Sequence, residues 1–193
     1  MSINGLITRE SPTAPFVPLE GEKSKGYCPT SILQLFPLGP NGKAVRNYEH
    51  AMTLKGRLFV TSLRVVFVSE KTSQDEKAPK GSPGSIDNVA ILYRQMTFQG
   101  RDDVPPHLVM PWLGSNYVSF KFNILPEQIE GNRNWLNFMY TWEANAYVEG
   151  NRSGLRDIFV LHSTLKEAIT DHLTSQNAGQ PTEDVEPLPF YEP

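Results

Sequence analysis

The clearest hydrophobic pattern in the chain lies in residues 55–69, which read KGRLFVTSLRVVFVS. Two short apolar runs, residues 58–60 and 65–68, flank a polar break at Thr61-Ser62. Most of their side chains are β-branched or aromatic, which favours strands, and the break has the length of a tight hairpin turn. The pattern predicts two adjacent antiparallel strands at the centre of a sheet. Because residues 65–68 do not alternate with polar positions, we expect that strand to be covered on both faces.

Five further stretches have the alternation or the composition of strands. They are residues 31–36, the later part of 44–54, 86–98, 116–124 and 135–147. In the fourth stretch the apolar face comprises Val118, Phe120, Phe122 and Ile124, and in the fifth one face holds Leu136, Phe138, Tyr140 and Trp142. Asn41-Gly42 is a typical hairpin-turn dipeptide. Pro105-Pro106 is expected to exclude sheet pairing within residues 101–111, because proline has no backbone N–H to donate.

The apolar period then changes from two residues to that of a helix. Side chains follow i, i+3, i+4, i+7 spacing for about five turns, at Leu155, Ile158, Phe159, His162, Leu165, Ile169 and Leu173. Ser153 suits the N-cap position, and Gly179 and Pro181 prevent the helix from continuing. We therefore predict an amphipathic helix over residues 153–175, with Phe159 and Leu165 facing the sheet.

Together these elements predict a mainly β fold, an antiparallel barrel or sandwich of six to seven strands capped by one C-terminal α-helix. Residues 27–175 form this domain. Residues 1–26 contain several prolines and no periodic pattern, so we expect a flexible segment there. Residues 70–88 are polar and predict an inserted surface loop. Residues 176–193 are acidic and proline-rich, and we expect a disordered tail.

Composition narrows the class of protein. The 193 residues have a formal net charge of −3, which does not indicate a nucleic-acid binder. Cys28 is the only cysteine, so an intrachain disulfide and a thiolate metal site are excluded. The chain has no basic-then-apolar leader and no apolar run near the roughly 20 residues that span a bilayer. We expect an intracellular protein of the nucleus, the cytoplasm or both, neither secreted nor transmembrane.

Two segments carry a resemblance to a known family. GRLFVTSLRVVFVS, residues 56–69, resembles the signature hairpin of the GRAM domain, a pleckstrin-homology-like module. MPWLGSNYVSF, residues 110–120, resembles a segment found in the family of WW-domain-binding protein 2. The two occur in the right order, and the resemblance covers residues 27–175. It implies a pleckstrin-homology-like fold and the role of a transcription coactivator that associates with chromatin and acts through WW-domain partners.

In that family the partners bind PPxY motifs in a long proline-rich tail. This chain has a short tail without PPxY, but its last residues, EPLPFYEP, contain the similar LPxY form. Prolines preset an extended polyproline helix, and the tyrosine can enter a second groove of the WW domain. The candidate peptide ligand comprises Pro187, Leu188, Pro189 and Tyr191. The alternatives are a chance match, or Phe190 and Tyr191 folding back onto the domain.

The first functional hypothesis is therefore a non-enzymatic adaptor that recruits a WW-domain protein, such as a HECT-type ubiquitin ligase or a transcriptional regulator. The second is a membrane phosphoinositide-binding module, in which basic residues near loops hold the phosphates. The candidates are Arg64, Lys55, Arg57, Lys71, Lys77 and Lys80. Because Glu70, Asp75 and Glu76 lie among them, a solvated surface is the favoured interpretation and lipid binding stays open.

No residue pattern indicates an enzyme, a metal or a cofactor. His162 and His172 are ten residues apart, which is not the i, i+4 spacing of a helical metal pair, so we expect core-edge histidines. Cys28 has no neighbouring base or basic cluster that would activate its thiol. Trp112, Trp135 and Trp142 are predicted to be core or rim aromatics, since lysine and arginine do not cluster with them as they do in a base-stacking surface.

Overall fold

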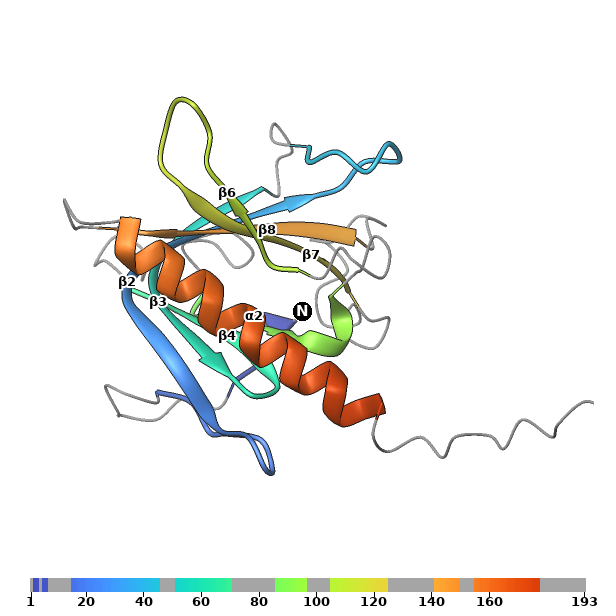
Figure 1. The fold of residues 1–193 in the computed structure, drawn as a ribbon. Helices are drawn as coiled ribbons and strands as arrows, with labels where there is room; N and C mark the ends of the chain where they lie inside the picture. The colour runs from blue at the N-terminus through green and yellow to red at the C-terminus, as the bar shows by residue number, and fades with distance from the viewer. Residues whose placement is uncertain are drawn as a thin grey trace, which may run out of the picture.

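The computed structural model describes residues 2–3, 5–6, 15–45, 51–70, 86–96, 105–124, 141–149 and 155–177. Antiparallel strands form one sheet in the order β1-β5-β4-β3-β2-β8-β7-β6, and one long helix follows (Figure 1). The elements are β1 (Ser2–Ile3), β2 (Ser24–Pro37), β3 (Met52–Thr61), β4 (Arg64–Ser69), β5 (Asn88–Leu92), the 3-10 turn η3 (Tyr93–Gln95), β6 (His107–Val109), β7 (Tyr117–Asn123), β8 (Thr141–Val148) and α2 (Leu155–Asn177). This confirms the predicted mainly β class with a C-terminal helix.

The strand β2 joins the two halves of the sheet. Its residues 24–35 pair with β3, and its residues 31–37 pair with β8. Pairing is irregular between Ser24 and Gly26 and again between Cys28 and Ser31, and such bulges bend a strand. The ladder does not close into a barrel, although a single bridge joins Met96, after η3, to Phe122 of β7. The result is consistent with a pleckstrin-homology-like sandwich whose open side is covered by α2 (Figure 1).

The central hairpin is formed as predicted. β3 and β4 pair from Gly56 with Ser69 to Val60 with Val65, and every residue from Val65 to Val68 is buried. Val65 and Phe67 belong to the main core. On the other face Val66 and Val68 belong to a second cluster with Phe16, Phe59 and Ala90. The strand is therefore covered on both faces.

The cover on the second face comes from the N-terminal segment. Phe16 is only 5% exposed, and its ring meets that of Phe59 edge-on at 5.5 Å. β2 begins at Ser24, three residues before the predicted start of the domain at Tyr27. The domain therefore extends N-terminal of the predicted boundary, because an apolar anchor and a strand start lie in residues that show no periodic pattern.

β6 contradicts the prediction for residues 101–111. His107–Val109 pair with Ser119, Val118 and Tyr117 of β7. Pro105 and Pro106 come just before the strand, so their missing N–H groups do not interrupt its ladder. β7 alternates as predicted, with Val118, Phe120 and Phe122 fully buried.

β8 is shorter in the described residues than the predicted strand over 135–147. It begins at Thr141 and directs Trp142, Ala144 and Ala146 into the core. Leu136, Phe138 and Tyr140 lie outside the described residues. The turn at Asn41-Gly42 is present: the Gly42 N–H donates to the Gly39 carbonyl at 2.9 Å, and Gly42 has φ +70°.

The buried face of α2 differs slightly from the predicted apolar stripe. Its buried side chains are Ile158, Leu161, Leu165, Ala168 and Ile169. Leu165 therefore faces the sheet as predicted, whereas Phe159 is 43% exposed and that prediction is wrong. Each residue advances a helix by about 100°, so a stripe centred on Ile158, Leu161 and Leu165 turns Phe159 toward solvent. The helix extends to Asn177, two residues beyond its predicted end, and Ser153 lies outside the described residues.

Candidate functional site

The predicted WW ligand cannot be placed in this fold. Pro187, Leu188, Pro189 and Tyr191 lie outside the described residues, as do Lys71, Lys77, Lys80 and Trp135. The last described side chains of α2, Thr174, Ser175 and Gln176, are exposed. The peptide motif therefore stays a prediction, and α2 presents a solvent-facing end before it in the chain.

Each of the described basic candidates has a contact of its own. The Lys55 Nζ lies 2.7 Å from a carboxylate oxygen of Glu149, and this hydrogen bond raises the pKa of Lys55. The Arg57 guanidinium lies 6.0 Å from the ring centre of Phe59. Arg64 is only 5% exposed, so the prediction of a solvated side chain is wrong for it. Each of these three cations is thus already in contact with a carboxylate or an aromatic ring.

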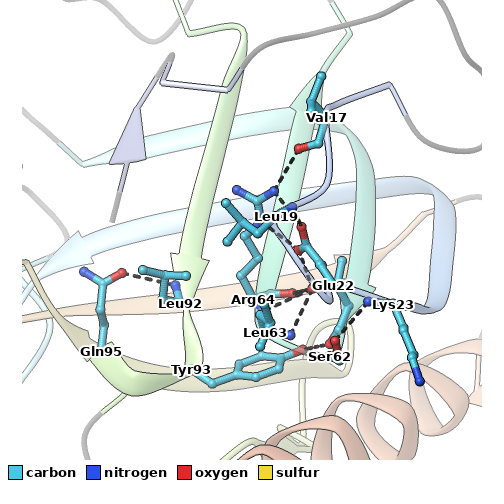
Figure 2. Close-up of polar contacts among 11 residues, drawn as sticks. Val17, Leu19, Glu22, Lys23, Ser62, Leu63, Arg64, Leu92, Tyr93 and Gln95 are labelled. Atoms are coloured by element: carbon cyan, nitrogen blue, oxygen red, sulfur yellow. Dashed lines mark hydrogen bonds and ion pairs between the residues drawn. The ribbon is translucent and has the colours of Figure 1, made fainter.

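Arg64 instead forms a buried ion pair with Glu22, 42 residues earlier in the chain (Figure 2). Its Nε donates to Glu22 Oε1 at 2.8 Å, and its Nη2 donates to Oε2 at 2.8 Å. The side chains are 6% and 1% exposed. Nη2 also donates to the Val17 carbonyl at 3.2 Å. This two-pronged geometry matches the fork of the guanidinium to the carboxylate.

Thr61 completes the network at the hairpin turn. Its hydroxyl lies 2.7 Å from Glu22 Oε1, and it accepts the backbone N–H groups of Leu63 and Arg64 at 3.2 and 3.1 Å. The Leu19 N–H donates to Glu22 Oε2 at 2.6 Å. The polar break between the two apolar runs is thus a hydroxyl-capped turn that also holds the N-terminal segment.

These contacts determine the charge of Glu22. Burial raises the pKa of the Glu22 carboxyl, but the hydrogen bonds from Arg64, Leu19 and Thr61, with the positive charge of Arg64, hold it below its ordinary value. Glu22 is therefore an anion in the folded protein at neutral pH. The Phe16 ring centre lies 5.5 Å from the Arg64 guanidinium and covers it. Since both charges are paired and covered, the network ties the N-terminal segment to the hairpin turn and offers no open position to a substrate.

Sequence reasoning missed this network although one signal was present. Arg64 is the single charged residue in the run from Leu58 to Val68. A lone cation in a strand covered on both faces needs a buried partner. The partner could not be chosen from the sequence, because Glu22 lies in a segment without any pattern.

A groove lies between the first half of β2 and the first turns of α2. It has a volume of about 510 Å³, and Tyr27, Val60, Val160, Leu161 and Thr164 are among its lining residues. At its edge the Lys25 Nζ lies 2.8 Å from Asp171 and is already paired. Cys28 is buried in its wall, and burial raises the pKa of its thiol, which donates to the Thr30 carbonyl at 3.3 Å. The groove also has Glu149 and Asp157 in its lining, so its walls mix apolar and charged side chains, and it contains no activated nucleophile among its lining residues.

The two helical histidines have packing roles, as predicted. The His162 Nε2 lies 3.0 Å from the Pro106 carbonyl oxygen, which ties α2 to the start of β6. The His172 ring meets Tyr93 edge-on at 5.7 Å, and burial lowers its pKa. The Tyr93 hydroxyl donates to the Thr61 carbonyl at 2.7 Å, and burial raises its pKa above the ordinary value. Within the described residues no group of three or more His, Cys, Asp or Glu side chains could hold a metal ion.

The tryptophans differ from one another. Trp142 is fully buried in the core, in agreement with the prediction. Trp112 is 99% exposed, so its assignment to the core or its rim is wrong. It lies in the connection between β6 and β7, whose apolar residues are not directed into the sheet.

Comparison with models of known protein families finds no match to this chain, and a search of curated proteins finds no similar sequence. In the part of the chain that the structure describes, no helix has the length and apolar character needed to cross a membrane.

Proposed function

We propose that this protein is a non-enzymatic adaptor of the GRAM type, in which a pleckstrin-homology-like domain carries a C-terminal ligand for a WW domain. The observation that carries the proposal is the order along the chain of the described domain and the LPxY motif. The last described element, α2, ends at Asn177 and its side chains at 174–176 are exposed, and the LPxY motif begins at Leu188. The motif is thus separate in sequence from every core element that the structure describes.

The chemistry of the motif supports a WW partner. Pro187 and Pro189 restrict the backbone to the extended form that WW domains bind, which reduces the entropy lost on binding. Tyr191 supplies an aromatic ring two residues after Pro189. Acidic residues flank the motif in the sequence, at Glu183, Asp184, Glu186 and Glu192. This charge favours a WW domain with a basic rim and makes the association rate depend on salt.

The resemblance to the family of WW-domain-binding protein 2 supports a role in transcription. We propose that the chain acts as a coactivator-like adaptor in the nucleus or cytoplasm. Its partner would be a HECT-type ubiquitin ligase or a transcriptional regulator, and any association with chromatin would pass through that partner. The formal net charge of −3 agrees with indirect rather than direct contact with DNA.

The alternative function, a phosphoinositide-binding module, has less support. Of its described candidate cations, Lys55 and Arg64 are each engaged with a carboxylate. Binding a phosphate with Arg64 would require breaking a buried ion pair, which is unfavourable. The adaptor is therefore the function that we favour.

The test is binding of the full chain to a panel of purified WW domains by fluorescence anisotropy. We expect a micromolar Kd for at least one domain and at least a tenfold weaker Kd for Tyr191→Ala, since the ring fills a groove. Phe190→Ala is the matched control, because the x position of the motif faces away from the tyrosine groove. Equal binding by Tyr191→Ala, or no binding to any domain, would contradict the adaptor.

A further inference from the structure

The connection between β6 and β7 has an apolar tip that no part of the proposed function uses. Met110, Trp112 and Leu113 are 62%, 99% and 86% exposed. They fall within four consecutive residues, with Pro111 between the first two. Figure 1 shows this connection as the yellow-green loop that projects from the top of the molecule. Several large apolar side chains exposed together usually mark an interaction site.

The base of this hairpin is firmly held, so the tip has a defined position. Val109 pairs with Tyr117 as the last pair of the β6–β7 ladder. Below it, Val118 is fully buried and Leu108 packs against the main core. The Tyr117 ring contacts that of Tyr147 at a centre-to-centre distance of 5.0 Å. Gly114 has φ +107°, a conformation that glycine adopts without strain, and it turns the chain back toward β7.

The segment that carries the tip has no acidic side chain, which favours a lipid surface. Residues 104–126 contain no aspartate or glutamate. The hairpin can therefore approach phosphate head groups without repulsion between like charges, and no carboxylate of this segment has to lose its water. A tip that carried carboxylates beside its apolar residues would not have this property.

We propose that residues 110–113 insert into the boundary between the head groups and the acyl chains of a lipid bilayer, with Trp112 as the anchor. Tryptophan is enriched at this depth because its ring is apolar and its N–H still reaches a hydrogen-bond acceptor. A narrow, projecting tip can enter a bilayer. It supplies little of the roughly 800 Å² that each partner buries in a standard protein–protein interface.

Insertion of this kind is weak and reversible. Three large side chains bury about as much apolar surface as a short acyl chain, and a single myristoyl chain binds membranes with an association constant of about 10⁴ M⁻¹. In Figure 1 the tip lies at the top of the molecule and the C-terminal end of α2 at the lower right. A protein held by its tip would therefore keep the end of α2 away from the bilayer.

The test is co-sedimentation of the full chain with phosphatidylcholine vesicles, with and without phosphatidylserine, together with its tryptophan fluorescence. We expect binding to both vesicles, a blue shift of the emission, and persistence in high salt, because apolar insertion is not screened. Trp112→Ala should weaken binding at least tenfold, and Trp112→Phe should keep most of it. Phe159→Ala, which removes another half-exposed aromatic ring, should bind like the wild type.

Three outcomes would overturn the proposal. They are no sedimentation of the wild type with either vesicle, equal binding by Trp112→Ala, and binding that high salt abolishes, which would indicate attraction to head groups by basic residues instead. Because Trp112 is 99% exposed, we expect its alanine variant to unfold at the wild-type temperature. Tyr191→Ala should sediment like the wild type, so failure of the lipid proposal and failure of the WW proposal remain distinguishable.

Discussion

Arg64 is a buried charged residue whose stability depends on its ion pair with Glu22. Its guanidinium and the Glu22 carboxylate are almost completely removed from water, and each satisfies the other through two hydrogen bonds of 2.8 Å. A buried pair of this kind is nearly neutral to stability as a unit, but removing one partner leaves the other charge buried and alone. The pair therefore makes the fold dependent on a contact between two distant parts of the chain.

Replacing Arg64 by methionine is expected to lower the free energy of unfolding by about 3–5 kcal/mol, because Glu22 would stay buried without a counter-charge. Urea denaturation followed by circular dichroism measures this. Lys25→Met is the matched control: Lys25 forms an ion pair with Asp171 at the surface, and its loss should change stability little. A loss for Arg64→Met no larger than that of the control would contradict the burial of the pair.

The pH dependence of stability follows from Glu22. Its pKa in the folded protein lies below the ordinary value of 4.5, so below that value the unfolded chain takes up the proton first. The contribution of Glu22 is therefore fully present above about pH 5 and is lost as the pH falls through the folded pKa. Measured by urea denaturation, the stability difference between wild type and Glu22→Gln should be largest near neutral pH and shrink under acid. A difference that stays constant down to pH 3 would show that Glu22 titrates normally.

At the scale of elements, α2 illustrates how a helix is fitted to a curved sheet. Its buried stripe runs from Ile158 through Leu161 and Leu165 to Ile169. Phe159 and Val160 are exposed, and Val160 lines the groove against β2. The helix is therefore held by a narrow row of aliphatic side chains and by the two histidine contacts, and its largest apolar side chain contributes little.

A pair of aspartate substitutions tests this orientation. Leu165→Asp is expected to cost about 3–5 kcal/mol, because it places an unpaired charge at a position that is 1% exposed. Phe159→Asp should cost at most about 1 kcal/mol, since water reaches that position. The stability losses are measured by thermal unfolding of both variants and the wild type. Equal losses for the two variants would mean that the helix faces the sheet with a different side.

At the scale of the whole molecule, the N-terminal segment is part of the domain. Phe16 closes the second face of β4, and Glu22 neutralises Arg64. Together they cover the second face of the sheet around β4. Removal of the segment would expose Val66 and Val68 at the same time as it leaves Arg64 unpaired.

Two shortened chains separate these contributions. A chain that begins at Ser24 should be less stable than Arg64→Met, because it also loses the apolar burial of Phe16, which is worth about 3 kcal/mol. A chain that begins at Pro15 keeps Phe16 and Glu22 but loses β1 and Leu6, which packs on the second cluster and donates its N–H to Asn88. Its urea midpoint should therefore lie between those of the full chain and of the chain that begins at Ser24. If both shortened chains unfold like the full protein, the segment has no structural role.

Much of the architecture could be predicted because secondary structure follows from local patterns. The run of apolar residues in β4, the alternation of β7 and the 3.6-residue period of α2 each predict the type of element and the side chains that it buries. The LPxY motif is equally local, and for that reason its residues could be named without a structure. The exposure of Trp112 could not be predicted, since an apolar residue near a strand end is usually buried.

By itself the sequence determined the class of fold, the central hairpin and the presence of one C-terminal helix, because periods of two and 3.6 residues arise from backbone geometry alone. The tertiary structure alone decided which partners these elements have. It brought Glu22 to Arg64 across 42 residues, placed Phe16 on the second face of β4, and directed residues 110–113 outward. A local pattern predicts whether a side chain is buried. The identity of its neighbour depends on how distant segments meet.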